Sequence, residues 1–298
     1  MKTDSYYQIG LSHEVCEDYA FSGEINEHIS YAIIADGCSS AEQVDVGARV
    51  LVHSAIEFLR EYYFSSNSIE TDKNIFEHKL RNSVIAKSIM VVKQLGLPIH
   101  SLCSTLIVSI MDKTRANVFM YGDGVVSVKY CNGDVIKYKV EYESGAPYYM
   151  IYSTNKEDDI MYTSHYGNTK TIKTKWDTSK DRDIVINTDT ISRYDFEHYQ
   201  NTCFSFLNPE VVSVMSDGVN SFREFVDGDN LKLTLEPVDT IKVADRMTDF
   251  KNFNGKFVNR RMKRFNKDCA KDGWTHYDDV SIASIFNEFN EFNEKNNA

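Results

Sequence analysis

The sequence has no uninterrupted apolar run near the roughly 18 residues that a membrane-spanning helix needs, so we expect no membrane segment. Positive charge is scarce. The 33 Lys and Arg side chains face 44 Asp and Glu side chains, which leaves a net charge of −11. A chain this acidic has no overall attraction for nucleic acid or anionic membranes, so we expect neither as a partner.

Cysteine is used sparingly, and its six positions show no Cys-x-x-Cys pair and no regular spacing. Residues 1–10 lack the features of a secretory signal, so we interpret the cysteines as reduced thiols of a cytoplasmic protein. No cysteine is followed by arginine six positions later. This excludes the Cys-x5-Arg loop that cysteine-dependent phosphatases need to bind phosphate and stabilise a thiolate.

The chain has enough apolar material for a large folded core. Apolar residues make up 42% of its 298 residues and include 17 Phe and 18 Tyr, which excludes an intrinsically disordered chain. Polar residues 141–208 have weak periodicity, and we interpret them as a variable insertion or flap within one domain over 1–288. Residues 289–298 are predicted to form a polar tail.

Apolar periodicity predicts both strands and helices along the chain. The Asn132-Gly133 pair predicts a type I′ hairpin, and Ser39 with Glu42 fits a capping box for the first helix. The predicted strands cover 31–35, 103–111, 117–121, 125–130, 135–140, 210–215 and 280–286, and the predicted helices cover 44–62, 73–95, 238–250 and 257–265.

The most informative pattern is an acid at the end or the start of an apolar strand. Asp36, Asp123 and Asp217 each follow such a strand and precede glycine, whereas Asp278 and the Glu17-Asp18 pair lead into strands. A single Asp-Gly pair is usually an ordinary turn. Several acids on one sheet rim repel one another unless cations neutralise them. Oxygen ligands without clustered His or Cys favour Mg²⁺ or Mn²⁺, and paired ions activate a bridging water against a phosphoryl group.

Six groups of short motifs follow one another along most of the chain. They are Gly10–His13 with Cys16–Asp18, Ala35–Ser40 with Gly47-Ala48, Cys103–Leu106, Tyr121–Gly124, Ser216–Val219 and Asp278–Ser281. In this order they resemble the metal-dependent protein phosphatase 2C family, especially its divergent bacterial branch. The resemblance implies an α+β fold: a four-layer α-β-β-α sandwich with two antiparallel sheets flanked by antiparallel helix pairs.

The resemblance also implies roles for individual acids. Asp36 would bridge two Mn²⁺ or Mg²⁺ ions at the catalytic centre, with the Gly37 carbonyl as a further ligand. Asp217, also catalytic, and Asp278 would complete the shell of the first ion.

The remaining acids would serve the other metal positions. Asp18, and Glu17 through water, would bind the second ion. Asp123 occupies the position associated with a third, weaker metal, although Ser221 stands where another acid can help to bind it.

Several residues depart from the family pattern. His13 stands where many members have a phosphate-binding arginine, and imidazole cannot form arginine's bidentate fork. Two interpretations of His13 stay open: a catalytic proton donor to the leaving alkoxide, or a structural residue. Cys38 stands where some members have a general-acid histidine. Asp279 replaces the commoner Asn, and we interpret it as a strand-start residue or a support for Asp278.

These observations predict a metal-dependent serine/threonine phosphoprotein phosphatase that hydrolyses phosphate monoesters through a metal-bridging water or hydroxide, and we expect it to act as a monomer. One alternative is a catalytically silent phosphatase-like module that binds a partner. Another is a metal-dependent phosphatase that acts on a small molecule. The basic run Arg260–Arg264 either contacts a phosphorylated partner or forms a solvated helix face.

Overall fold

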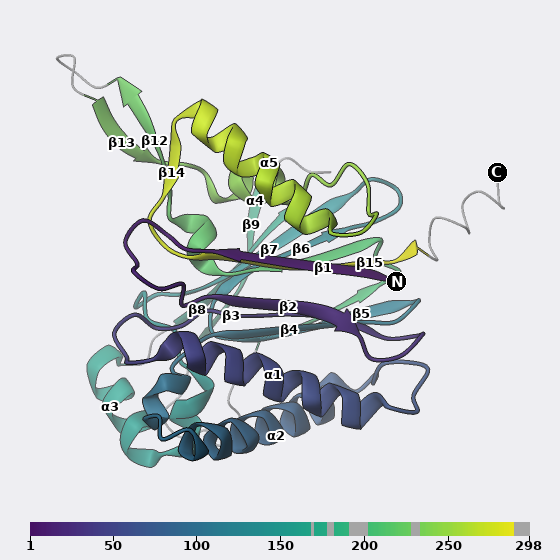
Figure 1. Ribbon diagram of the computed structural model, residues 1–298, viewed down its shortest axis with the longest axis vertical. Helices are drawn as coiled ribbons and strands as arrows, with labels where there is room; N and C mark the ends of the chain where they lie inside the picture. Colours follow the sequence, from purple (N-terminus) through teal and green to yellow (C-terminus); the bar gives the residue numbers. More distant parts are fainter. Residues whose placement is uncertain (168–169, 178–181, 191–201, 228–232, 289–298) are drawn as a thin grey trace.

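The structure is a computed structural model that describes residues 1–167, 170–177, 182–190, 202–227 and 233–288. Its strands form two large antiparallel sheets that pack face to face, with helices on both outer faces (Figure 1). The predicted α+β fold, a four-layer α-β-β-α sandwich, is confirmed. In the described ranges, no helix is both long enough and apolar enough to cross a bilayer.

The first sheet has seven strands in the order β1-β15-β11-β6-β7-β8-β9. Their bounds are β1 Lys2–Gln8, β15 Val280–Phe286, β11 Val211–Met215, β6 Gly124–Lys129, β7 Val135–Tyr142, β8 Lys170–Asp177 and β9 Arg182–Thr190. The second sheet has the order β10-β5-β4-β3-β2. Its strands are β10 Thr202–Leu207, β5 Arg115–Tyr121, β4 Leu106–Met111, β3 Ser30–Ala35 and β2 Tyr19–Glu24.

Helices cover the outer face of each sheet. The pair α1 (Val44–Tyr63) and α2 (Lys73–Gln94) lies below the five-stranded sheet in Figure 1, with α3 (Lys156–Tyr166) beside it. The pair α4 (Thr240–Thr248) and α5 (Phe257–Asp272) covers the seven-stranded sheet. A third, small sheet of β12 (Phe222–Asp227), β13 (Leu233–Pro237) and β14 (Trp274–His276) stands at one end.

Alternating side chains of the central strands build separate cores between the four layers. In β3, Ile33 packs against the α1–α2 pair, whereas its neighbour Ile34 packs between the two sheets. In β15, Ile282 faces the α4–α5 pair and Ala283 faces the other sheet. Because both faces of these strands are covered, every residue of β3 and β15 is buried, and each strand is a continuous apolar or small-residue run.

Two local predictions about turns and caps are wrong. Ser39 and Glu42 do not cap α1. The residue before the helix is Gln43, which has a left-handed backbone conformation and whose side chain forms no capping hydrogen bond. The predicted hairpin joins β6 and β7, but among the described non-glycine residues only Gln43 and Asn208 have positive φ. Within this turn only Gly133 has a positive φ, and its amide donates to the Tyr130 carbonyl. A type I′ turn needs positive φ at both central residues, so the turn is of another type.

The segment 141–208 is built into both sheets where the structure describes it. Strands β8 and β9 extend the seven-stranded sheet beyond β7, and β10 forms an edge of the five-stranded sheet. Tyr148, in the stretch between β7 and α3, packs edge-on against Tyr162 of α3. The predicted tail 289–298 lies outside the described residues.

Candidate active site

The register of the five-stranded sheet brings two of the predicted acids together. Tyr19 at the start of β2 pairs with Ala35 at the end of β3. Asp18 precedes Tyr19 and Asp36 follows Ala35, so both acids leave the sheet at the same rim.

The register of the seven-stranded sheet brings three more of the predicted acids together. Met215 at the end of β11 pairs with Ile282 near the start of β15 and with Val125 near the start of β6. Asp217, Asp278 and Asp123 therefore leave that sheet at one rim. Asp123 lies in the link from β5 to β6, which carries the chain from one sheet to the other.

The turn that holds Asp36 is fixed by its neighbour strand. The Asp36 amide donates to Thr105 Oγ1 at 3.2 Å, and the Thr105 amide donates to the Asp36 carbonyl at 2.8 Å. Gly37 forms an isolated antiparallel bridge with Ser104, and its amide donates to the Glu17 carbonyl. This pairing fixes the backbone of Asp36 and Gly37 before any side chain of the site is considered.

The turn that holds Asp217 depends on a glycine. A Cβ atom on Gly218 would lie 1.7 Å from the Asp279 carbonyl oxygen, so only glycine allows this turn to pack against the strand that begins after Asp279. Ser221 Oγ donates to the Gly218 carbonyl at 2.7 Å and so closes the same turn. The Asp-Gly pair after β11 therefore serves close packing of two strand ends.

Asp18 is the innermost acid of the group. Its side chain is almost fully buried, and its Oδ2 accepts a hydrogen bond of 2.7 Å from Ser216 Oγ. Its Oδ1 is also buried, and none of the residues that the structure describes forms a hydrogen bond with it. Burial raises the pKa of Asp18 to about 7, although the hydrogen bond from Ser216 opposes this shift.

The other acids act on one another electrostatically. Burial and the negative charges of Asp18 and Asp217 raise the pKa of Asp36 well above its usual value. Burial and Asp217 likewise raise the pKa of Asp123, and they raise that of Asp278 to about 6. Carboxyl groups with such raised pKa values are stabilised by a proton or by a cation.

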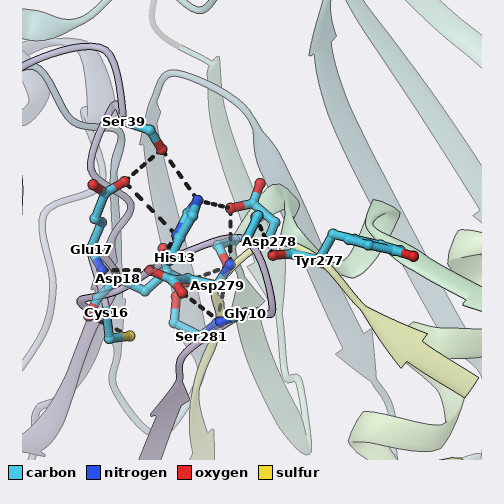
Figure 2. A network of polar contacts seen from close by, with 12 residues as sticks. Gly10, His13, Cys16, Glu17, Asp18, Ser39, Tyr277, Asp278, Asp279 and Ser281 are labelled. Carbon is cyan, nitrogen blue, oxygen red and sulfur yellow. Dashed lines mark hydrogen bonds and ion pairs between the residues drawn. The ribbon is translucent and has the colours of Figure 1, made fainter.

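A loop from Gly10 to Glu17 is tied to this group by Asp279 (Figure 2). Asp279 is buried, and its two carboxylate oxygens accept hydrogen bonds from the Gly10 amide at 2.7 Å and the Glu17 amide at 2.5 Å. Its Oδ2 also lies 3.0 Å from His13 Nδ1. The Asp279 carboxylate thus holds the loop at three points.

His13 stands at the centre of Figure 2, between acids and a serine. Its Nε2 lies 3.6 Å from Asp278 Oδ1 and 3.3 Å from Ser39 Oγ. Burial alone lowers the pKa of His13, but the hydrogen bond and charge of Asp279, with the charges of Asp278 and Glu17, raise it above its usual value. The acids around His13 therefore stabilise the protonated form of its imidazole.

Sequence reasoning missed the serines that support these acids. Ser216 contacts Asp18, and Ser39 donates to Glu17 Oε2 at 2.6 Å instead of capping α1. Ser216 directly precedes Asp217 at the end of β11, and that position was the available signal. The contact of Ser39 depends on the fold of the loop before β2, which no local pattern specifies.

The donors in this group suit a hard divalent cation. Among the described residues, no group of three or more His, Cys, Asp or Glu side chains is arranged so that it could hold a metal ion as it stands. The group nevertheless offers carboxylate oxygens and the Gly37 carbonyl, and the partnerless buried Oδ1 of Asp18 lacks the cation or proton that such an oxygen requires. The residues present therefore fit Mg²⁺ or Mn²⁺.

Comparison with known families gives an independent result. The family described as protein phosphatase 2C matches residues 11–250, which is most of the chain. The chain belongs to the protein phosphatase 2C family. This membership supports phosphatase activity. A comparison with curated protein sequences finds no match.

Solved structures of protein phosphatases share the fold at low sequence identity. The serine/threonine phosphatase Stp1 from Staphylococcus aureus matches with a TM-score of 0.52 at 10% identity, over 96% of this chain and 95% of that one. A bacterial serine phosphatase matches with a TM-score of 0.51 at 10% identity, over 97% and 98%. A structure of the phosphatase domain of SpoIIE from Bacillus subtilis with a fragment of its regulatory domain matches at 12% identity and a TM-score of 0.49. That match covers 96% of this chain and 63% of the other.

Proposed function

We propose that this protein is a metal-dependent serine/threonine phosphoprotein phosphatase. The strongest support is the buried Oδ1 of Asp18, which no described residue hydrogen-bonds and which lies in a group of acids drawn from distant parts of the chain. A catalytically silent module has little physical reason to keep several carboxyl groups that repel one another in a partly buried site.

Each acid has a place in this proposal. Asp36 and the Gly37 carbonyl would help to hold two Mn²⁺ or Mg²⁺ ions. Asp217 and Asp278 would hold the first of these ions. When bound, the ions supply an activated water and positive charge for the phosphoryl group.

The second ion and a weaker third ion use the remaining acids. We assign Asp18, and Glu17 through water, to the second ion. Asp123 is assigned to the third. The hydrogen bond from Ser39 holds the Glu17 carboxylate in one orientation.

His13 is proposed as the proton donor to the leaving serine or threonine oxygen. Asp279 fixes Nδ1 at 3.0 Å, so Nε2 is the ring nitrogen left to face a substrate beside Asp278. The surrounding carboxylates raise the pKa of the imidazole, which favours the form that can donate a proton.

The test measures hydrolysis of a phosphoserine peptide and of p-nitrophenyl phosphate with Mn²⁺, with Mg²⁺ and with EDTA. We expect activity only with metal, and a loss of kcat of roughly 100-fold or more in Asp36→Asn and in Asp217→Asn. Asp134→Asn is the matched control, because Asp134 lies in the β6–β7 turn, where its side chain accepts a hydrogen bond from Asn132. Metal-independent turnover that survives both site substitutions would overturn the proposal.

A further inference from the structure

The basic run of the sequence lies on α5 and lines a groove. The groove lies between α5 and the loop 249–256 that joins α4 to α5, and its volume is about 590 Å³. Met262 and Phe265 face the core, so the charged residues between and beyond them turn outward. We call this the basic groove. Its lining residues are Asp249, Phe250, Lys251, Asn252, Phe257, Arg260, Arg261, Lys263, Arg264, Lys267 and Asp268.

The charge of the basic groove is opposite to that of the whole chain. Six of its lining residues are Lys or Arg and only two are Asp, whereas the chain has a net charge of −11. A concave surface with charge of one sign focuses its field and raises the local concentration of ligands of the other sign. An anionic partner is therefore attracted to this groove and repelled by most other surfaces.

Two of the cations are fixed in position. Arg260 donates to the Asn254 carbonyl and, at 2.8 Å, to Asn252 Oδ1. The side chain of Arg261 is 10% exposed; its Nε donates to the Arg246 carbonyl at 2.5 Å, and its NH2 group lies 3.6 Å from Asp268. Each guanidinium keeps further N–H donors beyond these contacts, so a ligand meets donors that have already lost their side-chain freedom.

Three other cations are available for a partner. Lys263, Arg264 and Lys267 are exposed on neighbouring turns of α5. In the described part of the chain, the one ion pair of Arg264 is with Asp268 at 3.9 Å, and Lys263 and Lys267 have none. On α5, five Lys and Arg residues line the groove beside one acid, Asp268, so this face keeps an excess of positive charge.

We propose that the basic groove binds an acidic segment of another protein. Carboxylates of the segment contact Lys263, Arg264 and Lys267, and an apolar side chain beside them packs against Phe250. The cations from residue 260 to residue 267 span about 10 Å of helix, which matches a few residues of peptide. A nucleic acid, with a charge about every 1.7 Å along its axis, extends past this patch onto the acidic remainder of the surface.

This binding site is separate from the candidate active site. The basic groove shares no lining residue with the group of acids around Asp36, and most of its cations lie on α5, a helix that covers the outer face of the seven-stranded sheet in Figure 1. Its occupation therefore does not require the proposed phosphatase chemistry, and its failure would leave that chemistry untouched.

The test uses fluorescence anisotropy with a fluorescein-labelled peptide Glu-Glu-Phe-Glu-Glu-Phe-Glu-Glu at low and at high NaCl. We expect binding at low salt that weakens as salt screens the charges. Lys263→Glu/Lys267→Glu should weaken binding by about ten-fold or more, because it reverses two contacts. Lys79→Glu/Lys156→Glu makes the same change in net charge at exposed positions of α2 and α3, and we expect less than about a two-fold effect.

Three results would overturn the inference: no peptide binding by the wild-type chain, equal weakening in the two variants, or tighter binding of a single-stranded DNA of equal charge than of the peptide. Phosphatase activity of the groove variant is measured in parallel. We expect it to be unchanged, and this also shows that the variant is folded.

Discussion

The proposed role of His13 places two requirements on one side chain. It must be held rigidly, and it must carry a positive charge close to acids that are proposed to bind cations. Asp279 meets the first demand, since its buried carboxylate contacts Nδ1 and two amides of the same loop. Asp278 and Glu17 favour the charge. An arginine at this position would bind phosphate by a fork, whereas imidazole can also release a proton.

Replacing His13 should therefore affect substrates according to their leaving group. For His13→Gln we expect kcat on a phosphoserine peptide to fall by about 100-fold, because an alkoxide needs a proton as it leaves. Hydrolysis of p-nitrophenyl phosphate should fall far less, because its leaving group is stable as an anion. His28→Gln is the control, since His28 lies in the loop before β3 and contacts Glu27. Equal losses on both substrates would assign His13 to phosphate binding or to structure.

At the scale of elements, the sequence predicts a helix or strand best where the residues of that element alone determine its structure. The central strands β3, β4 and β15 are buried on both faces, so their apolar runs were sufficient to locate them, and α2 begins at the predicted residue. Strand β1 was missed because all of its residues are half-buried, and its extended form depends on pairing with β15.

In the candidate site, too, some residues are predicted by local sequence patterns and others only by long-range contacts. An acid followed by glycine at a strand end is a local signal, and it located Asp36 and Asp217. The contact between Ser216 and Asp18 joins residues 198 positions apart in the sequence. It depends on how the two sheets pack against each other, which no local sequence pattern specifies. The proposed role of each acid as a metal ligand stays a prediction.

The turn after β11 offers a test of whether the site needs the end of β11 and the start of β15 to pack closely. In Gly218→Ala the new methyl group would overlap the Asp279 carbonyl, so the turn and the start of β15 must separate. We expect a loss of stability of about 1–3 kcal/mol and loss of metal-dependent activity.

The matched control for this substitution is Gly96→Ala. Gly96 has φ of +71° but open space around it, so alanine there strains the backbone by about 1 kcal/mol without touching the site. Urea unfolding and phosphatase assays on both variants make the comparison. Full activity of Gly218→Ala would show that close packing at Asp279 is not required.

At the scale of the whole molecule, the fold gathers negative charge at one end of the sandwich in a chain that is already acidic. The raised pKa values of Asp18 and Asp278 mean that the folded chain, without metal, holds more protons than the unfolded chain between about pH 4 and pH 7. Stability without metal must then fall as pH rises through this range, because the unfolded state binds fewer protons there. A cation that replaces those protons restores the loss.

Removing one central acid should therefore have opposite effects with and without metal. In EDTA at pH 7.5 or so, Asp36→Asn should unfold at a higher temperature than the wild type, since it removes a charge that Asp18 and Asp217 repel. Saturating Mn²⁺ should stabilise the wild type by about 2.7 kcal/mol at a concentration of about 100 times Kd, and the variant far less. Thermal unfolding followed by circular dichroism measures both, with Asp134→Asn as the control that keeps the wild-type response. If Mn²⁺ raised the melting temperature of Asp36→Asn and the wild type equally, the acids around Asp36 would not be its binding site.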